Sequence, residues 1–412
     1  MNIVYINHYA GSPDLGMEFR PYHLGQEWVK SGHNITLLAA SYSHVRTKQP
    51  TLIDNKKTTE NINGLEYVWY PTPSYSGNGL SRIKNIFSFL RQIWIDSHNL
   101  VKKYRPDVVI ASSTYPMDIW IAKRLAKKAN AKLVFEIHDL WPLSPIELGG
   151  MSPKHPFIQL CQFAENSAYK YADVVISMLP NVQEHTKAHG LDLSKLHIIP
   201  NGVVVEDWAS EFTPLDNSLE ELIITEKNKG HKIVCYSGAH GRPNALEKLL
   251  KTASLLHDKP MTFLLVGTGL EKANLIKKSQ SLGTNNIIFF DPIPKTQIPA
   301  LLNKIDIAYI GLQKQSLFRF GISPNKLIDY MMAGKPILCA IDAGNDPVSD
   351  VNCGISVKSG KPEDIAQALL KLSKLSTDKL NQMGQKGKIY ALENHTYSIL
   401  ADNFLKAIIN HE

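Results

Sequence analysis

The chain has 412 residues, of which 43% are hydrophobic and 20% charged, and its formal net charge is +7 at pH 7. This length suits two domains with separate cores, and the composition is typical of a globular protein rather than a disordered or fibrous one. No run of about 18 apolar residues occurs, which excludes an obvious membrane-spanning helix.

The first residues, Met1 to Asn7, predict a strand rather than a signal peptide, so we expect a cytoplasmic protein. The positive charge favours anionic partners, and the chain carries no basic-aromatic motif that would indicate nucleic acid. No metal-ligand spacing, Ser/His/Asp arrangement or P-loop sequence is evident, so no metal or cofactor is expected. The cysteines are interpreted as buried thiols; they are Cys161, Cys235, Cys339 and Cys353.

Short apolar runs alternate with longer amphipathic ones along the first half of the chain. Strands rich in Val, Ile and Leu that alternate with helices predict a parallel sheet covered on both faces. The expected strands and helices are 3–7, 18–31, 35–40, 108–111, 117–129, 133–137, 156–171, 174–177 and 196–200.

The same alternation restarts at residue 232 and predicts a second domain of the same class. Its elements are 232–236, 246–256, 262–266, 270–282, 287–290, 298–303, 305–310 and the run 320–338, with helices after Lys361 and Asp378. The polar segment between the two series predicts a linker. The domains are therefore 1–203, a linker at 204–230, 231–391, and a C-terminal segment 392–412 whose amphipathic helix 397–409 can pack on either domain.

The predicted fold class is thus α/β, with two doubly wound parallel sheets. Such sheets bind ligands beyond the carboxyl ends of their strands, so two domains that face each other would form one cleft. Glycine-containing loops follow several of the predicted strands, at 7–16, 237–242 and 266–269, and a proline-containing loop follows another at 291–294. Glycines also occur in strand-to-helix turns for packing reasons alone. The evidence for a ligand site is therefore that all these loops follow the carboxyl ends of strands.

The loop after the first strand contains Gly11, Ser12 and Gly16, and the two glycines permit close approach of a bound group. Glu18 and Arg20 follow it and could touch an acceptor. An exposed helix N-terminus explains the glutamate equally well.

His138 and Asp139 end a strand and precede Trp-Pro, so their side chains can face a cleft. A histidine there could bind a sugar hydroxyl or carry a proton. The alternative is a histidine satisfied by local backbone. Arg242, at the start of a helix, could bind a diphosphate, or it could be a solvated surface residue.

The run 320–338 combines a glycine turn, a helix start and a strand. Ser323 and Pro324 predict a helix that begins at about Ser323 and ends at Gly334. Lys326 and Asp329, three residues apart, would then project together near its N-terminus. A lysine at a helix start suits a phosphate, and the acid could accept a hydrogen bond from a sugar hydroxyl. A solvated Lys/Asp pair on a capped helix is the alternative.

Residues 80–96 predict a basic, aromatic, amphipathic helix. One face carries an apolar stripe with arginine and lysine near it; the stripe is Ile83, Ile86, Phe87, Leu90, Ile93 and Trp94. Such a helix can lie on an anionic membrane surface, although a helix that faces a core has the same pattern.

Together these loops and the run 320–338 resemble the retaining, nucleotide-sugar-dependent glycosyltransferases of family 4, which have the GT-B fold. The likeness covers nearly the whole chain, and the N-terminal loop is most similar to the bacterial O-antigen and capsule subgroup with its WbuB-like L-fucosamine transferases. The resemblance implies these donor-site residues: Gly238, Arg242, Gly267, Thr268, Gly269, Ile293, Gly321, Ile322, Ser323, Lys326 and Asp329. It further implies catalytic roles for His138, Asp139, Arg242 and Lys326, and an acceptor or phosphate loop of Gly11, Ser12, Gly16, Glu18 and Arg20.

One departure from the family is clear, because the family usually has a glutamate eight residues before the ribose-binding acid and this chain has Gly321 there. The usual arginine and lysine for the diphosphate do not align well either, and Arg242 and Lys326 are the substitutes that we expect.

The resemblance implies transfer of a sugar, N-acetyl-L-fucosamine or another N-acetylated hexose, from a UDP-sugar to a lipid-linked saccharide in O-antigen or capsule synthesis. The expected partners are this donor, a lipid-diphosphate-linked acceptor and the cytoplasmic face of the inner membrane, with no metal or nucleic acid. A UDP-sugar 2-epimerase of the same fold and a catalytically inert nucleotide-sugar-binding protein are the alternatives.

Overall fold

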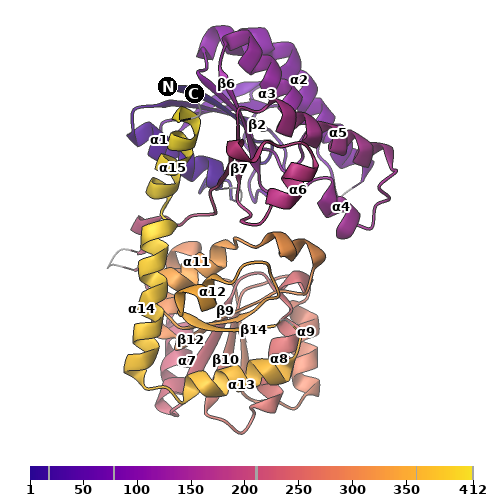
Figure 1. Cartoon of the computed structure of the whole chain (residues 1–412). Coiled ribbons are helices and arrows are strands. Elements are labelled where there is room, and N and C mark those ends of the chain that lie inside the picture. The colour runs from indigo at the N-terminus through magenta and orange to yellow at the C-terminus, as the bar shows by residue number, and fades with distance from the viewer. Residues whose placement is uncertain (17–18, 78, 209–211, 359, 411–412) are drawn as a thin grey trace. The chain divides into compact units, whose positions relative to one another are not determined.

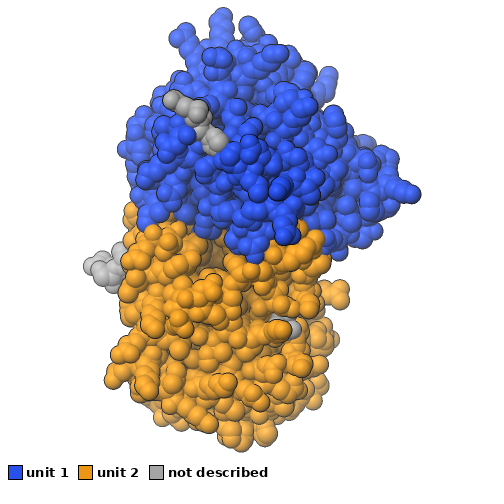
Figure 2. All heavy atoms as spheres, viewed as in Figure 1, with its two compact units in different colours: residues 1–201, 397–412 blue, residues 202–396 orange. Residues whose placement is uncertain are grey.

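The computed structural model describes the whole chain except residues 17–18, 78, 209–211, 359 and 411–412. It consists of two compact units (Figure 2), Met1–Asn201 together with Tyr397–Glu412, and Gly202–Thr396. The chain therefore passes between the units twice, once before Gly202 and again before Tyr397.

The first unit is built on an eight-stranded sheet with the order β3-β4-β2-β1-β5-β6-β7-β8. Its continuous Val, Ile and Leu runs are buried because helices lie on both faces of the sheet (Figure 1). The strands are β1 Asn2–Ile6, β2 Asn34–Ala40, β3 Thr58–Ile62, β4 Leu65–Tyr70, β5 Val108–Ala111, β6 Lys132–Ile137, β7 Val174–Ser177 and β8 Leu196–Ile198.

The edge of this sheet differs from the prediction, which placed no strand between residues 40 and 108. Strands β3 and β4 form an antiparallel hairpin there, whereas the other strand pairs of the sheet are parallel. Asn63 and Gly64 make the turn with φ angles of +51° and +88°. An Asn-Gly pair between two β-rich runs is a strong hairpin signal, so the sequence does contain the information.

The helices of the first unit include one that comes from the far end of the chain. Helix α15 packs on α1: Trp28 donates a hydrogen bond from Nε1 to the carbonyl of Ala401 at 3.0 Å, and its ring lies 5.1 Å from that of Phe404. The helices are α1 Arg20–Lys30, α2 Leu80–Tyr104, α3 Asp118–Ala129, α4 Leu143–Glu147, α5 Pro156–Tyr171, α6 Gln183–Ala188 and α15 Tyr397–Ile409.

The second unit contains a six-stranded, fully parallel sheet with the order β11-β10-β9-β12-β13-β14. Counted within the unit, this is the order 3-2-1-4-5-6 of doubly wound nucleotide-binding folds. The strands are β9 Lys232–Ser237, β10 Met261–Val266, β11 Ile287–Phe290, β12 Ile307–Gly311, β13 Ile337–Ala340 and β14 Gly354–Val357.

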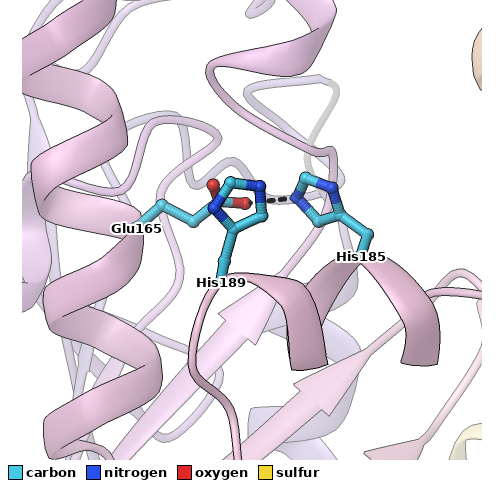
Figure 3. Close-up of side chains that lie close together, drawn as sticks. All are labelled: Glu165, His185 and His189. Atoms are coloured by element: carbon cyan, nitrogen blue, oxygen red, sulfur yellow. Dashed lines mark hydrogen bonds and ion pairs between the residues drawn. The ribbon is translucent and has the colours of Figure 1, made fainter.

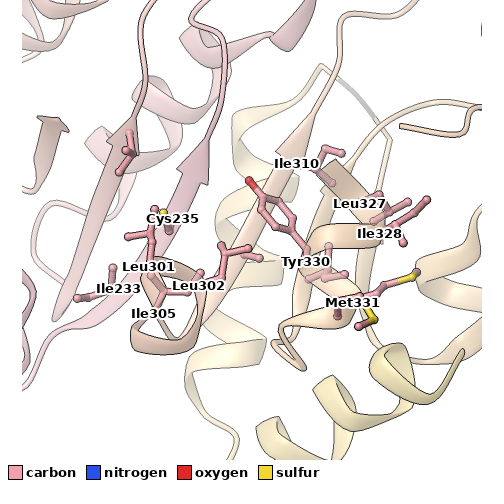
Figure 4. Close-up of a cluster of buried hydrophobic side chains, with 14 of the residues drawn as sticks. Ile233, Cys235, Leu301, Leu302, Ile305, Ile310, Leu327, Ile328, Tyr330 and Met331 are labelled. Carbon is pink, nitrogen blue, oxygen red and sulfur yellow. The ribbon is translucent and has the colours of Figure 1, made fainter. Parts of the chain in front are cut away.

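Both faces of this second sheet are buried. Along β9, Ile233 and Cys235 belong to one hydrophobic cluster (Figure 4), whereas Val234 and Tyr236 belong to the other. The helices that cover the faces are α7 Asn217–Asn228, α8 Leu246–Leu255, α9 Lys272–Ser281, α10 Ile298–Lys304, α11 Asn325–Met332, α12 Pro347–Val351, α13 Pro362–Ser373 and α14 Thr377–Asn394. The predicted class of two doubly wound parallel-sheet domains is therefore confirmed.

The segment 204–230, interpreted above as a linker, is part of the second unit. It contains α7, whose Leu219 and Ile223 are buried in the cluster of Figure 4. The segment lacks a strand pattern because it supplies a covering helix. At the other end, the second unit extends beyond residue 391 to Thr396.

The predicted apolar stripe of helix α2 lies partly on its buried face and partly on its exposed face. Ile86, Leu90 and Ile93 are buried in the unit, whereas Phe87 and Trp94 are 42% and 44% exposed. None of the described helices combines the length and the apolar character needed to cross a bilayer.

Candidate functional site

The second unit offers a ligand position where the strand order reverses. Strands β9 and β12 are neighbours although two strands of the sheet, β10 and β11, lie between them in the sequence. The chain therefore continues to one side of the sheet after β9 and to the other side after β12. The crevice outside such a switch point is where open α/β sheets bind ligands. The loop after β9 begins at Gly238, and α11 brings Lys326 to this loop.

Helix α11 begins two residues later than predicted. Pro324 has an extended ψ of 128°, and Asn325 is the first helical residue. The side chain of Asn345 holds the preceding segment extended, because its amide accepts from the N–H of Ile322 at 2.8 Å and donates to the carbonyl of Ile322 at 3.1 Å. The helix ends at Met332, and Gly334 follows with a φ of +63°.

Lys326 is packed against the end of β9. Its Nζ donates a hydrogen bond to the hydroxyl of Tyr236 at 2.8 Å and lies 3.9 Å from the centre of that ring. Burial lowers the pKa of Lys326 to about 8, whereas Asp329 and Cys235 act in the opposite direction. A bound phosphate would stabilise this partly desolvated ammonium, because its negative charge offsets the cost of burying the positive one.

Asp329, one helical turn after Lys326, lies in a similar environment. Burial raises its pKa to about 6, and Asp207 raises it further, whereas Lys295 and Lys326 lower it. Asp207 and Lys295 also face each other, with 3.5 Å between carboxylate and ammonium. The predicted pairing of Lys326 and Asp329 on one side of α11 is what the structure shows, although both are more buried than a surface pair would be.

The two glycine loops at the carboxyl ends of β9 and β10 pack backbone against backbone. A Cβ atom at Gly267 would collide with the carbonyl of Gly238, and one at Gly269 would lie 2.5 Å from the carbonyl oxygen of His240. His240 donates its N–H to the carbonyl of Thr268 at 2.7 Å. Gly267 has a φ of +146°, so glycine is needed here for conformation and for space.

His240 is a residue that the sequence interpretation did not assign to the site. Its side chain is fully buried, and neither ring nitrogen has a hydrogen-bond partner among the described residues. Burial, together with Lys272 and Lys326, lowers its pKa to about 4, so the ring is neutral. Both ring nitrogens are shielded from solvent, so a ligand could hydrogen-bond this neutral imidazole only if the glycine loop moved. The only sequence signal is its place in a glycine loop after a strand.

Arg242 begins a short 3-10 helix, Arg242–Asn244, after the loop that follows β9. The Arg242 side chain is exposed and lines a cavity of about 330 Å³ with Lys248 and Lys251 of α8. Among the described residues that line this cavity, Lys326 and Asp329 are absent.

The remaining predicted donor residues lie around α11 and the β11 loop. Ile293 and Ile322 are half-buried and pack against the cluster of Figure 4. Gly321 has a φ of +89°, and its N–H donates to the carbonyl of Phe318 at 2.9 Å. The glutamate that the family resemblance would place at 321 would be strained in this conformation. Ser323 lies between these residues and α11 and is half-buried.

In the first unit, His138 belongs to a buried polar network at the end of β6. Its Nε2 lies 3.1 Å from Oε2 of Glu136 and 2.7 Å from the Ser112 hydroxyl. Glu136 also accepts hydrogen bonds from Tyr5 and Ser112 and is 0% exposed. The ionised carboxylate of Glu136 can accept the Nε2–H of His138, and this contact orients the ring.

Arg20 is part of the same network. Its Nε donates to Oε1 of Glu136 at 2.8 Å, and its other nitrogens donate to the carbonyls of Ile199 and Pro200. Burial by itself would raise the pKa of Glu136, but Arg20 and His138 outweigh it and hold that pKa well below its usual range. These bonds occupy the guanidinium of Arg20 inside the unit, so acceptor contact by Arg20 is disfavoured. Glu18, the other predicted acceptor residue of this segment, lies outside the described residues.

Asp139 points to its own loop. One carboxylate oxygen accepts hydrogen bonds from the Leu140 N–H at 2.9 Å and the Ser144 hydroxyl at 2.6 Å. It therefore fixes the entry to α4, which is a positioning role.

The loop with Gly11, Ser12 and Gly16 is held by two buried side chains. Tyr67 donates its hydroxyl to the carbonyl of Gly11 at 2.7 Å, and Arg46 donates to the carbonyl of Ala10. Gly16 has a φ of +82° and pairs with Ser12 in an isolated antiparallel bridge. The loop is thus a fixed part of the unit.

One group of side chains could hold a metal ion, although no metal spacing was recognised in the sequence. Glu165, His185 and His189 place one ligand atom each within 4.8 Å of one another (Figure 3). The signal in the sequence is the spacing of four residues between His185, on α6, and His189, which directly follows that helix.

Known proteins resemble both halves of the chain. Residues 16–207 match the family described as Glycosyltransferase Family 4, and residues 219–390 match that described as Glycosyl transferases group 1. WcaI of Escherichia coli (strain K12), named for colanic acid biosynthesis as a glycosyl transferase, is 26% identical over 235 residues, 57% of each chain. WbjE of Pseudomonas aeruginosa, named as a glycosyltransferase, is 21% identical over 336 residues, 80% of each chain.

Among solved structures, Anabaena Alr3699/HepE in complex with UDP and glucose superposes with a TM-score of 0.65 at 15% identity and 98% coverage of both chains. This similarity concerns the fold alone.

Proposed function

Because the chain belongs to the glycosyltransferases of family 4, with the two Rossmann-like units of the GT-B fold, we propose that it transfers a sugar from a nucleoside diphosphate sugar. The observation that carries the proposal is the Lys326 and Asp329 pair beside Gly238 at the switch point of the second sheet. The ammonium of Lys326 would bind the diphosphate. The carboxylate of Asp329 would accept a hydrogen bond from a ribose hydroxyl.

In the proposed reaction, the bond between the anomeric carbon and the diphosphate oxygen breaks while a bond to the acceptor oxygen forms. The acceptor proton passes to the leaving diphosphate. Negative charge grows on this diphosphate, and Lys326 would stabilise it from a partly desolvated position. We propose a substitution on one face of the sugar, with retention of configuration, in which Lys326 takes the charge-balancing role that other enzymes give to a metal ion.

The relatives support a more specific donor and acceptor. HepE was crystallised with UDP, and WcaI is named for the synthesis of colanic acid. We therefore propose UDP as the nucleotide and a lipid-linked saccharide of a bacterial surface polysaccharide as the acceptor. N-acetyl-L-fucosamine and other N-acetylated hexoses are the donor sugars to test first.

The experiment is a screen of UDP-sugars for UDP release, with and without lipid-diphosphate-linked saccharides. The proposal expects release that depends on the acceptor. Conversion of a UDP-sugar without acceptor would instead indicate the 2-epimerase, and binding without turnover an inert protein.

A matched pair of variants tests the nucleotide site by calorimetry. Asp329→Ala should weaken UDP binding about tenfold, which corresponds to about 1.4 kcal/mol. Asp350→Ala, which removes an exposed acid from α12, should leave the dissociation constant unchanged. Equal affinities in both variants would exclude the ribose role of Asp329.

We further propose that α2 contacts an anionic membrane. Leu80, Phe87 and Trp94 are exposed at intervals of seven residues, and the exposed Lys84 and Arg91 lie on the same side of the helix. Apolar side chains flanked by basic ones suit the interface of a bilayer that carries acidic lipids. A lipid-linked acceptor would be met at that surface.

Flotation with vesicles that contain acidic lipids tests this contact. Phe87→Glu combined with Trp94→Glu should lower the bound fraction several-fold. Ile53→Glu, which adds the same charge at another exposed apolar position of the first unit, is the control. An unchanged bound fraction in the double variant would show that this face does not bind the membrane.

A further inference from the structure

Three metal-ligating side chains gather where α5 and α6 approach each other, and the proposed transfer reaction uses none of them. Figure 3 shows the rings of His185 of α6 and of His189, the residue that directly follows α6, beside the carboxylate of Glu165 on α5. Their ligand atoms lie within 4.8 Å of one another, and Nε2 of His185 is 2.9 Å from Oε1 of Glu165. Two histidines with this spacing present their rings on one helical face.

The kind of ligand follows from these three groups. Two imidazoles and one carboxylate are a set that Zn²⁺ binds, with a water molecule in the fourth position. Bonds of 2.0 to 2.1 Å in a tetrahedron place ligand atoms about 3.4 Å apart. Because the three ligand atoms lie within 4.8 Å of one another, no pair has to approach by more than about 1.4 Å, which side-chain rotation can supply.

The surroundings orient the ligands. Glu165 accepts hydrogen bonds from the Tyr169 hydroxyl at 2.9 Å and from Nε2 of Gln162 at 2.7 Å, and the same Gln162 nitrogen lies 3.0 Å from Nδ1 of His189. Outer hydrogen bonds of this type fix the rotamers of metal ligands.

The charge balance favours a cation. Glu165 is 2% exposed and, among the described residues, has no lysine or arginine ion-pair partner. A buried carboxylate is costly without a compensating positive charge. A divalent ion would supply that charge.

We propose that Glu165, His185 and His189 bind a divalent transition-metal ion, with zinc the best match, and that this ion joins α5 to α6. The role is structural. Glu165 also lines a small cavity with Asp139 and Trp141 of the loop after β6, so the ion would brace the region beside His138. The alternative is a hydrogen-bond network of the same side chains that binds no metal.

The test uses the full chain after treatment with a chelator, titrated with Zn²⁺ by calorimetry. The proposal expects one tight site that is at least about 100-fold weaker in His189→Asn, and a melting temperature that Zn²⁺ raises in the wild type but not in His189→Asn. His98→Asn, which removes an exposed histidine of the same unit, is the matched control and should keep the site. Binding that is equally weak in all three proteins would overturn the proposal.

A second measurement needs no variant. X-ray absorption spectroscopy at the zinc K-edge, on the wild-type protein loaded with one equivalent of Zn²⁺, identifies the ligand atoms directly. Two imidazoles and oxygen ligands in the first shell would support the assignment. A shell of sulfur ligands, or of water alone, would contradict it, and this outcome leaves the proposed transfer reaction untouched.

Discussion

The ammonium of Lys326 covers Gly238 so closely that a Cβ atom added to this glycine would lie 2.8 Å from Nζ and 2.9 Å from Cε. Gly238 has a φ of +140°, which side chains rarely adopt. Gly238→Ala should therefore displace the lysine and weaken UDP binding about tenfold in calorimetry.

The control for this variant is Gly283→Ala. Gly283 also has a positive φ, +64°, but a Cβ atom there meets nothing within 4 Å. Both alanines carry backbone strain, and only the one at 238 faces Lys326. Equal UDP affinities in the two variants would contradict the proposed position of the phosphate.

The affinity for a UDP-sugar should be greatest between about pH 6 and pH 8. The pKa of Lys326 is lowered to about 8, so the free enzyme loses the ammonium above that pH, and affinity should fall by up to tenfold per pH unit. The pKa of Asp329 is raised to about 6, so below that pH the carboxylate becomes a neutral and weaker acceptor. Calorimetry from pH 5 to pH 9.5 measures the fall in affinity on both sides of this range.

Two variants test which residue causes each fall in affinity. Lys326→Met should remove the decline above pH 8, and Asp329→Asn should remove the one below pH 6, each with lower affinity at pH 7. A profile that both variants share with the wild type would mean that other groups titrate.

Replacement of His138 should separate chemistry from nucleotide binding. His138 lies in the first unit, whereas the proposed nucleotide site lies in the second. His138→Ala should therefore lower the rate of transfer at least about 100-fold and leave the affinity for UDP nearly unchanged. Unaltered turnover would refute a role for this histidine in the reaction.

Glu136→Gln should destabilise the first unit by about 3 kcal/mol, because it leaves the Arg20 charge buried without its partner. Urea unfolding followed by tryptophan fluorescence suits the measurement, since every tryptophan except Trp208 lies in that unit. Glu27→Gln breaks an exposed pair with Lys30 and should cost below about 0.5 kcal/mol. A similar small loss for Glu136→Gln would show that the pair is not needed for stability.

Gly384→Ala should destabilise the second unit by about 1 to 3 kcal/mol. A Cβ atom at this position of α14 would overlap the carbonyl of Gly334, the residue that closes α11. Hydrogen exchange of the second unit reports the loss, with the exposed Gln382→Ala of the same helix as control. Unchanged protection in Gly384→Ala would mean that the two helices can move apart at little cost.

Much of the fold could be predicted because the buried parallel strands are nearly continuous in apolar residues. Helix 156–171 and helix 397–409 have the predicted bounds. The hairpin at the sheet edge was missed, because β3 is exposed and polar and follows no apolar pattern. The helix α7 was missed because only three of its residues are buried.

The candidate site could be predicted where the residues that interact are close in the sequence. Lys326 and Asp329 lie within one helical turn, so their spacing alone pairs them. Glu136 could not be assigned this way, because its partner Arg20 is 116 residues away, although an acid inside an apolar strand was a signal.

The return of the chain to the first unit has a consequence for synthesis on the ribosome. Trp28 stays uncovered until α15 has been made, and α15 follows the entire second unit, which is continuous from Gly202 to Thr396. At about 5 to 20 residues per second, nearly 200 residues take on the order of 10 to 40 s. The unit that emerges first is therefore the one that completes its core last, and in the interval a chaperone can reach its exposed tryptophan.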